Sequence, residues 1–423
     1  MYNLLKKLFP ICRSITGNGV RETFNILKDH LPLDIKEYPT GMKCFDWEIP
    51  DEWNISDAYI TDEQGVKVVD FSKNNLHVLG YSEPVNNKTF SLNQLKVNIY
   101  TLPDQPELIP YLTSYYKRRW GFCMSHNELC SLKDGNYTVN IDSTLEPGFL
   151  TLGEAFLPGK IDKEILISCY LCHPSMANDS ISGVVLTTDL YKKLSQIDRY
   201  YSYRFLFLPE TIGSIAYLSQ NQKRVFKKTY GGFVITCVGD PGIFTYQRSI
   251  HKSHVIDRIA ENVLKNSGKE YKIRNFRFAG SDESQYSSPG FNLPVGSLMR
   301  TAYPHFIQYH TSADNLDFVT EDALNESLEM YLKVIKGIEG NKVFKNNNPY
   351  CAPKLDKRGL YPSLGSQRNI SEEIYRMNWL LNYGNGENSL IDIAEEVDTS
   401  ILNLIETSEK LEKEGLLTLD GSK

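Results

Sequence analysis

The chain has 423 residues, of which 41% are hydrophobic and 12% aromatic, and its formal net charge is −6. This length allows two or three domains, and the composition is that of an ordinary globular protein. The mildly acidic balance excludes the charge pattern typical of nucleic-acid or anionic-membrane binding.

Two further patterns predict where the protein acts. The longest apolar runs are too short to cross a membrane, and the first residues lack the features of a signal peptide. The eight cysteines are scattered, which is not the spacing of a secreted disulfide framework. We therefore expect a cytoplasmic protein with no membrane partner.

The first third of the chain changes from a helical to a strand-like pattern. Apolar residues recur at helical spacing over 20–31. From Trp47 to about Leu145, short strand-like runs alternate with turn signals, and residues 58–71 have the pattern of a β-hairpin. We predict that residues 1–46 begin a larger domain and that 47–145 form an inserted β-rich domain.

Strands and helices alternate over residues 146–345, the main part of the larger domain. Strand-like runs at 164–171, 200–208 and 231–239 are separated by helical patterns at 182–197 and 212–222, and further helices are predicted at 254–266 and 321–338. This alternation predicts an α/β fold with a mostly parallel sheet flanked by helices. In such sheets, functional side chains lie at the carboxyl ends of the strands.

The last part of the chain, residues 346–423, is predicted to be a linker (346–365) and a winged-helix domain. Helices are expected at 372–381, 390–397 and 401–414, followed by a strand at 415–421. The last helix carries four glutamates and two lysines, whereas a DNA recognition helix needs net positive charge. We expect no nucleic-acid partner and favour protein contact, with a homo-oligomer as the candidate assembly.

Residues 169–173 spell Cys-x-x-Cys-His at the end of a predicted buried strand, a motif with three competing chemistries. Covalent haem attachment requires export, and a zinc knuckle requires a second cysteine pair that the chain lacks. We interpret Cys169 and Cys172 as small buried side chains. The remaining interpretation is a metal site that uses His173 and the nearby Asp179.

Three residues further along the chain strengthen the metal interpretation. Each lies just after a strand-like run or in a connecting loop, and the complete set is His173, Asp179, Glu210, Asp282 and His310. Imidazole and carboxylate ligands suit Zn²⁺, and two metal ions can together activate a water whose proton a further carboxylate accepts. Each residue also has an ordinary interpretation, as a helix cap, a turn residue or a loop histidine. Their shared position at strand ends favours the metal site.

Two other residues flank the proposed site. Arg300 and Tyr309 have the chemistry to bind a substrate carboxylate or to stabilise an oxyanion. We predict them as substrate-binding residues.

The segments ANDSISG, YHTSADNLDF and SDE resemble motifs of zinc aminopeptidases of the M28 type. The resemblance is closer to the DUF4910 group, which carries an inserted DUF2172 domain and a C-terminal winged helix; matching segments include CHPSMANDSISG, FLPETIGSIAYLS and KRGLYPSLG. It implies a phosphorylase/hydrolase-like α/β fold, two zinc ions and an association with surface-polysaccharide biosynthesis.

The resemblance also implies roles for individual residues. Asp179 would bridge two zinc ions and precede a cis peptide bond, and the remaining ligands would be His173 with Asp282 for one ion and Glu210 with His310 for the other. The M28 pattern has adjacent glutamates, of which the first is the general base, whereas this chain has Pro209-Glu210. The catalytic base is therefore predicted to be Glu210 or Glu283. The family's His-x-Asp pattern is also changed, to His-Pro-Ser, so a different group must orient the imidazole.

Together these patterns predict a metallo-aminopeptidase or amidohydrolase that cleaves an amide, peptide-like or aminoacyl bond. Its partner would be a small-molecule or peptide-like substrate, with an amino sugar or peptide-modified glycan precursor as a candidate. The alternatives are a non-catalytic metal- or ligand-binding protein and a regulator with a degenerate peptidase domain.

Overall fold

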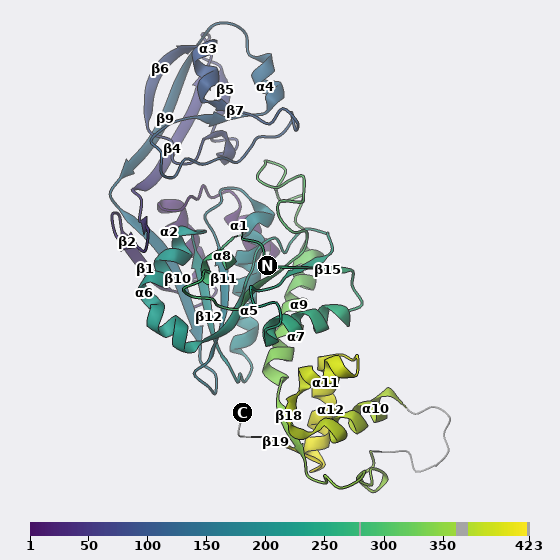
Figure 1. Ribbon diagram of the computed structural model, residues 1–423. Coiled ribbons are helices and arrows are strands. Elements are labelled where there is room, and N and C mark those ends of the chain that lie inside the picture. Colours follow the sequence, from purple (N-terminus) through teal and green to yellow (C-terminus); the bar gives the residue numbers. More distant parts are fainter. Residues whose placement is uncertain (279–280, 361–370, 421–423) are drawn as a thin grey trace. The chain divides into compact units, whose positions relative to one another are not determined.

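A computed structural model describes residues 1–278, 281–360 and 371–420 (Figure 1). It contains two compact units, Met1–Ile250 with Arg274–Leu328 and His251–Ile273 with Glu329–Lys423. Within the described ranges, no helix is both long and apolar enough to cross a membrane. Residues 361–365 of the predicted linker lie outside the described ranges.

The first unit is built on a β-sheet whose central strands are parallel. Its strands run in the order β1-β10-β12-β11-β13-β16-β14. The pairs that β11 makes with β12 and β13 are parallel, as is the β13–β16 pair, whereas β1, β10 and β14 pair antiparallel with their neighbours. The predicted mostly parallel sheet is confirmed. The strands are β1 (Asp34–Pro39), β10 (Phe149–Leu157), β11 (Glu164–Tyr170), β12 (Ser202–Leu208), β13 (Thr229–Val234), β14 (Phe244–Gln247) and β16 (Val295–Met299).

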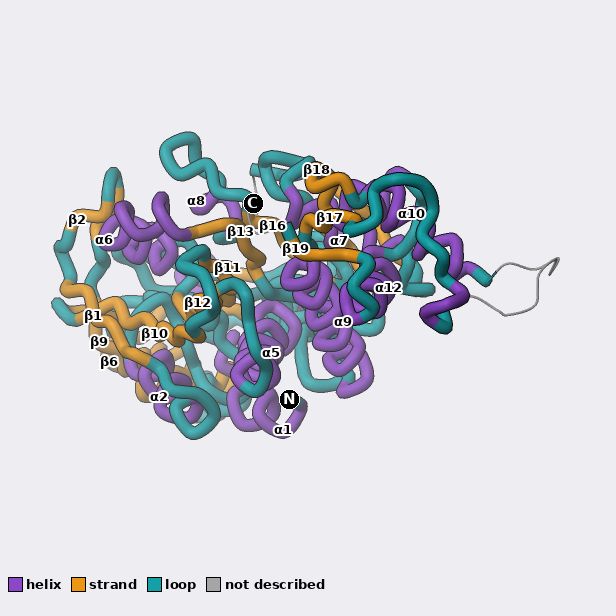
Figure 2. Tube along the Cα trace, turned by 90° about the horizontal axis from the view of Figure 1, so that it is seen from below, coloured by secondary structure: helices purple, strands orange, loops and turns teal. Residues whose placement is uncertain are grey.

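Every residue of β11 and β12 is buried, because helices cover both faces of the sheet. Figure 2 shows α1, α2 and α5 along one side and α6 and α8 along the other. The helices predicted at 182–197 and 212–222 are confirmed, and the second extends further than predicted. The helices that cover the sheet are α1 (Tyr2–Leu8), α2 (Asn18–Leu27), α5 (Gly183–Ser195), α6 (Ile212–Lys228) and α8 (Glu283–Tyr286).

The insertion contains a second sheet, with the antiparallel order β5-β4-β9-β6. Strands β4 and β5 form the hairpin predicted at 58–71. The elements of this region are β2 (Lys43–Cys44), β3 (Trp47–Glu48), β4 (Glu52–Thr61), β5 (Lys67–Asp70), β6 (Val85–Ser91), α3 (Leu92–Leu95), β7 (Ile99–Tyr100), β8 (Phe122–Cys123), α4 (His126–Ser131) and β9 (Asn136–Glu146).

An ion pair joins the insertion to the core of the first unit. Arg21, on α2, donates to both carboxylate oxygens of Glu52, at 2.7 and 2.5 Å. The backbone N–H of Phe149 donates to Glu52 as well, at 2.9 Å. Burial opposes ionisation of Glu52, but these donors lower its pKa to about 2. The ionised carboxylate of Glu52 therefore joins β4 of the insertion to α2 and to the start of β10.

The second unit contains a small sheet in the order β18-β17-β19 and the helices predicted for the winged-helix region. Helix α7 packs against α11 and α12, and its Arg258 pairs with Asp392 and Glu395. Helix α9 runs through the boundary between the units, and the predicted domain boundaries stay a prediction. The elements are α7 (Val255–Lys265), β15 (Tyr271–Arg274), α9 (Glu321–Gly340), β17 (Val343–Asn346), α10 (Glu372–Tyr383), β18 (Asn385–Ser389), α11 (Leu390–Glu396), α12 (Ile401–Lys413) and β19 (Leu417–Leu419).

Candidate metal centre

Three of the predicted metal ligands meet at the carboxyl edge of the parallel strands. His173 follows β11, Asp179 lies in the turn before α5, and His310 lies in the loop after β16. The three residues offer one ligand atom each, and these atoms all lie within 4.8 Å of one another. The Nε2 atom of His310 is 3.1 Å from Oδ2 of Asp179. Among the residues that the structure describes, these three are the histidine, cysteine or carboxylate side chains that lie close enough together to hold one metal ion.

The backbone around Asp179 is held by a second carboxylate. Asp179 lies at a kink in the π-helical turn Ala177–Ser182, and the peptide bond to Ser180 is cis, as the family resemblance implied. Asp314 accepts hydrogen bonds from the backbone N–H groups of Asn178 at 2.6 Å and of Asp179 at 2.9 Å. The hydroxyl of Tyr170 donates to Oδ1 of Asp179 at 2.5 Å. The carboxylate of Asp179 is thereby oriented before any ligand binds.

The protonation states of His173 and Asp179 suit metal binding. Burial lowers the pKa of His173 to about 4, so its imidazole is neutral at physiological pH. For Asp179, burial raises the pKa, but His173, His310 and the Tyr170 hydroxyl bring it down to about 2. A metal ion requires a neutral imidazole and an ionised carboxylate from its ligands, and His173 and Asp179 provide these.

Further carboxyl groups, of which Asp282 and Asp314 are fully buried and Glu210 is half-buried, are protonated more readily than usual. Burial, with the negative charges of Asp179 and Asp282, raises the pKa of Glu210 well above its ordinary value. Burial also raises the pKa of Asp282 to about 7 and that of Asp314 to about 8. Buried carboxylate oxygens without a hydrogen-bond partner include Oδ2 of Asp282 and Oε2 of Glu283. The residues therefore fit a divalent cation, because its charge would stabilise the ionised carboxylates and the unpartnered atoms.

Glu210 and Asp282 lie outside the three-residue group. The Oε2 atom of Glu210 is 3.7 Å from Nε2 of His173, and its Oε1 accepts a hydrogen bond from Ser281 at 2.6 Å. Asp282 uses Oδ1 to accept from the Thr211 backbone N–H at 2.7 Å and from the Ser214 hydroxyl at 2.8 Å. One oxygen of each carboxylate is thus engaged in holding the loops.

The remaining predicted site residues have different surroundings. Glu283 is fully buried and accepts hydrogen bonds from Gln247 and from the Tyr303 hydroxyl, both at 2.6 Å. Tyr309 stacks on the His310 ring, with centroids 3.9 Å apart. Arg300 donates hydrogen bonds to the Gly242 carbonyl at 2.9 Å and to Glu326 at 3.1 Å. Its guanidinium is therefore engaged in contacts within the protein. Substrate binding by Arg300 and Tyr309 stays a prediction.

His173 contacts a thiol and a guanidinium. Its Nδ1 lies 3.4 Å from Sγ of Cys172, and its carbonyl accepts a hydrogen bond from the buried Arg13 at 3.0 Å. Cys169 and Cys172 are both buried free thiols, as predicted from the sequence.

The sequence interpretation missed Tyr111, which comes from the insertion. Its ring centroid lies 5.0 Å from that of His173 and 5.1 Å from that of His310. Its backbone N–H donates to the His310 carbonyl at 2.8 Å. No local sequence pattern indicates that a loop tyrosine will pack against histidines that lie far along the chain. Asp314 could have been found, because it ends the His-Thr-x-x-Asp motif.

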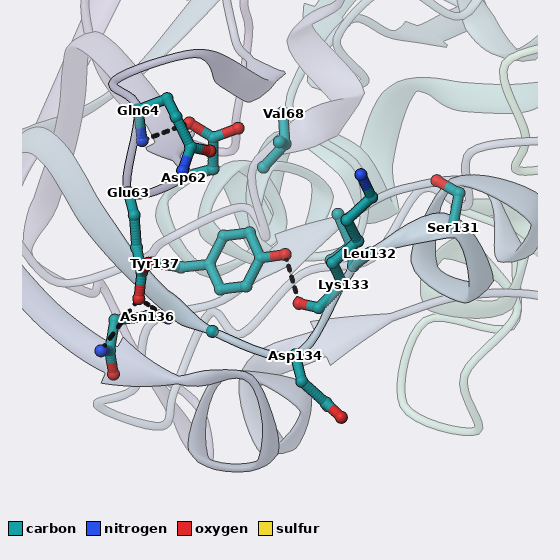
Figure 3. Close-up of a pocket in the computed structure, with 11 residues that line it drawn as sticks. Asp62, Glu63, Gln64, Val68, Ser131, Leu132, Lys133, Asp134, Asn136 and Tyr137 are labelled. Carbon is teal, nitrogen blue, oxygen red and sulfur yellow. Dashed lines mark hydrogen bonds between the residues drawn. The ribbon is translucent and has the colours of Figure 1, made fainter.

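A separate hollow lies in the insertion, lined by residues 62–64, 68 and 131–137 (Figure 3). Asp62 accepts hydrogen bonds from two backbone N–H groups of its own turn, and Glu63 accepts from Asn136. These carboxylates stabilise turns, and the lining contains no histidine or cysteine. The hollow therefore lacks the combination of imidazole and carboxylate groups found at the candidate metal centre.

The chain is similar to known proteins over most of its length. Residues 2–341 match a family model described as a domain of unknown function (DUF4910), and residues 342–419 match a winged helix-turn-helix model. A Clostridium acetobutylicum protein is 52% identical over 394 residues, which are 93% of this chain and 90% of that protein. Its description is a polysaccharide biosynthesis protein with an aminopeptidase-like domain.

Solved structures show the same fold. A crystal structure of a candidate peptidase from C. acetobutylicum has a TM-score of 0.94 at 49% identity and covers 99% of this chain and 96% of its own. A zinc aminopeptidase from Bacillus subtilis has a TM-score of 0.58 at 10% identity, over 80% of this chain and 94% of its own. A peptidase M28 precursor from Shewanella amazonensis has a TM-score of 0.57 at 14% identity, over 79% of this chain and 91% of its own. The chain therefore belongs to the DUF4910 family, with an α/β fold shared with M28 peptidases and a C-terminal winged helix.

Proposed function

We propose that this protein is a metal-dependent hydrolase of aminopeptidase-like type that cleaves an amide or peptide-like bond. The observation that carries the proposal is the convergence of His173, Asp179 and His310 within 4.8 Å, with the carboxylate of Glu210 beside them. A group of three ligands next to a half-buried carboxylate is the arrangement expected of a metal-assisted hydrolase.

We propose zinc as the metal, because two imidazoles and a carboxylate are the donors typical of catalytic zinc sites. When bound, Zn²⁺ supplies a Lewis acid that polarises a carbonyl and lowers the pKa of water. The three-residue group supports one ion, whereas the family resemblance implies two. Metal analysis that finds two ions per chain would favour the two-ion arrangement, in which Glu210 and Asp282 complete the ligand sets.

In the one-ion arrangement, Glu210 is the general base. Its side chain is 27% exposed, so it is accessible from the site, and its Oε2 atom lies on the His173 side. Oε2 accepts a proton from the attacking water and returns it to the leaving nitrogen as the carbon–nitrogen bond breaks. Glu283 is fully buried, with one oxygen held by two donors, which makes it the weaker candidate.

The chemistry of the substrate is proposed from the relative's description. An enzyme of polysaccharide biosynthesis that cleaves amides would act on an amino sugar or a peptide-modified glycan precursor. We propose a cytoplasmic location, which the free thiols of the described chain support, since free thiols persist in reducing compartments.

Removal of the metal tests the proposed activity. Turnover is measured on a panel of aminoacyl anilides and N-acyl amino sugars, before and after treatment with a chelator. We expect hydrolysis of at least one class, loss of that activity on chelation, and its return when zinc is added back. A protein that contains zinc and leaves both classes of substrate intact would favour the alternative of a non-catalytic ligand-binding protein.

We propose that the winged helix contacts protein, as in a homo-oligomer, rather than DNA. On α12, Glu406, Glu409 and Glu412 outnumber the lysines, and Lys410 already pairs with Glu373. Phosphate contacts require free positive charge. We expect the full-length protein to leave the anisotropy of a labelled DNA duplex unchanged at physiological salt. Salt-sensitive binding to the duplex would contradict this expectation.

A further inference from the structure

A pocket of about 290 Å³ opens beside Glu210. We call it the aromatic pocket, and its walls include Trp47, Tyr115, Tyr116, Cys172, Glu210 and Ile212. Glu210 is thus shared between this pocket and the candidate metal centre. A molecule that reaches the metal centre is within reach of the pocket.

The walls of the aromatic pocket are mainly apolar. The rings of Trp47 and Tyr116 meet edge to face with centroids 5.6 Å apart, and their side chains are 40% and 53% exposed. Cys172 and Ile212, which also line the pocket, are almost fully buried. None of the residues that line the pocket is a lysine or an arginine. Such a pocket favours an uncharged apolar or aromatic group over a phosphate or carboxylate.

The aromatic walls do not come from the parallel sheet. Trp47 lies on β3, and Tyr115 and Tyr116 lie in the loop between β7 and β8 of the insertion. This loop is bound to the metal centre, because the Tyr111 backbone donates to the His310 carbonyl and residues Pro110 and Thr311 form a β-bridge. The hydroxyls of Tyr111 and Tyr115 are 3.1 Å apart. A continuous set of contacts therefore runs from the histidines to the pocket wall.

We propose that the aromatic pocket binds an uncharged apolar group, preferably aromatic, carried next to the scissile carbonyl of the substrate. The inserted segment and the β2–β3 hairpin would then determine which substrates are accepted. This assignment rests on the proposed hydrolase function, since it places the substrate carbonyl at the metal centre. It adds the chemical class of the neighbouring group and the residues that select it.

Binding of small amides, followed at Trp47 itself, tests the assignment. The full-length protein has four tryptophans, so labelling with 5-fluorotryptophan gives four fluorine resonances, and Trp47→Phe identifies that of Trp47. The probes are 3-phenylpropanamide and propanamide, which differ by the phenyl group. We expect 3-phenylpropanamide to shift the Trp47 resonance with an affinity about 10-fold or more above that of propanamide, and the Trp379 resonance to stay unchanged.

A matched pair of variants supplies the control. Tyr116→Ala removes a pocket wall, whereas Tyr375→Ala removes a tyrosine of similar exposure, 52%, from the second unit. We expect the preference for the phenyl group to disappear in Tyr116→Ala and to persist in Tyr375→Ala. Equal affinity of the two probes for the unmodified protein would overturn the assignment, as would a stronger response of Trp47 to N-acetylglucosamine.

The binding readout separates this inference from the proposed function. A phenyl preference at Trp47 in a protein that hydrolyses no amide would support the pocket and contradict the hydrolase. Hydrolysis with no such preference, unaffected by Tyr116→Ala, would support the hydrolase and contradict the pocket.

Discussion

Replacement of Glu210 by glutamine is expected to lower kcat by about 10²–10⁴-fold, the range that general-base catalysis contributes. The amide preserves the size of the side chain but cannot accept the proton of the attacking water. Glu210 does not belong to the three-residue group, so zinc content should be unchanged in the variant. The measurement is the steady-state rate on the best substrate of the panel, together with metal analysis of the same preparation.

Glu283→Gln is the matched comparison. Its Oε1 accepts hydrogen bonds from Gln247 and Tyr303, which the amide oxygen of glutamine can also accept. We expect a loss of about tenfold or less, the scale of one weakened hydrogen bond. A large loss in Glu283→Gln with a small one in Glu210→Gln would identify Glu283 as the base. Loss of zinc from Glu210→Gln would identify Glu210 as a ligand.

Replacement by alanine of a residue of the three-residue group is expected to remove the bound metal. In His310→Ala or Asp179→Ala, one ligand of three is lost, so zinc affinity should fall by more than the roughly 10–100-fold cost of removing an outer partner. The measurement is competition for zinc with a chelator of known affinity. The control is His305→Ala, which removes an exposed histidine of the same loop and should retain the original affinity.

Asp314→Asn gives an intermediate result in the same experiment. Asp314 holds the backbone N–H groups of Asn178 and Asp179 with its two oxygens. Asparagine presents only one oxygen, so one N–H loses its acceptor and the Asp179 carboxylate is less well oriented. We expect zinc affinity to fall by about 10–100-fold. Equal affinities in all four variants would contradict the assigned site.

Much of the fold follows from local patterns in the sequence. The runs at 164–171 and 200–208 are apolar throughout because β11 and β12 are buried on both faces, and the helices between them keep an amphipathic spacing. The family resemblance also implied the cis bond at Asp179–Ser180, which the structure contains. The extension of α6 to Lys228 was missed, since its last part is mostly polar and charged.

The composition of the candidate site was predictable, but its arrangement was not. The sequence named His173, Asp179 and His310, which converge, along with Asp282, whose Oδ1 instead holds the Thr211 backbone. Topology predicts that residues following parallel strands lie at the same edge of the sheet, but it does not predict which of their side chains meet. Which way each side chain turns depends on the loop contacts.

The sequence by itself determined the family, the alternation of strands and helices, and the kinds of ligand at the carboxyl edge, because these depend on periodicity and short motifs. Only the tertiary structure decided that Tyr111 of the insertion packs against the site histidines and that Tyr115 and Tyr116 line a pocket shared with Glu210. It also decided that Cys172 lies beside Nδ1 of His173. These contacts join segments far apart in the chain, and no local pattern encodes them. The physical reason is that burial and hydrogen bonding between distant loops, rather than backbone propensity, set the positions of these side chains.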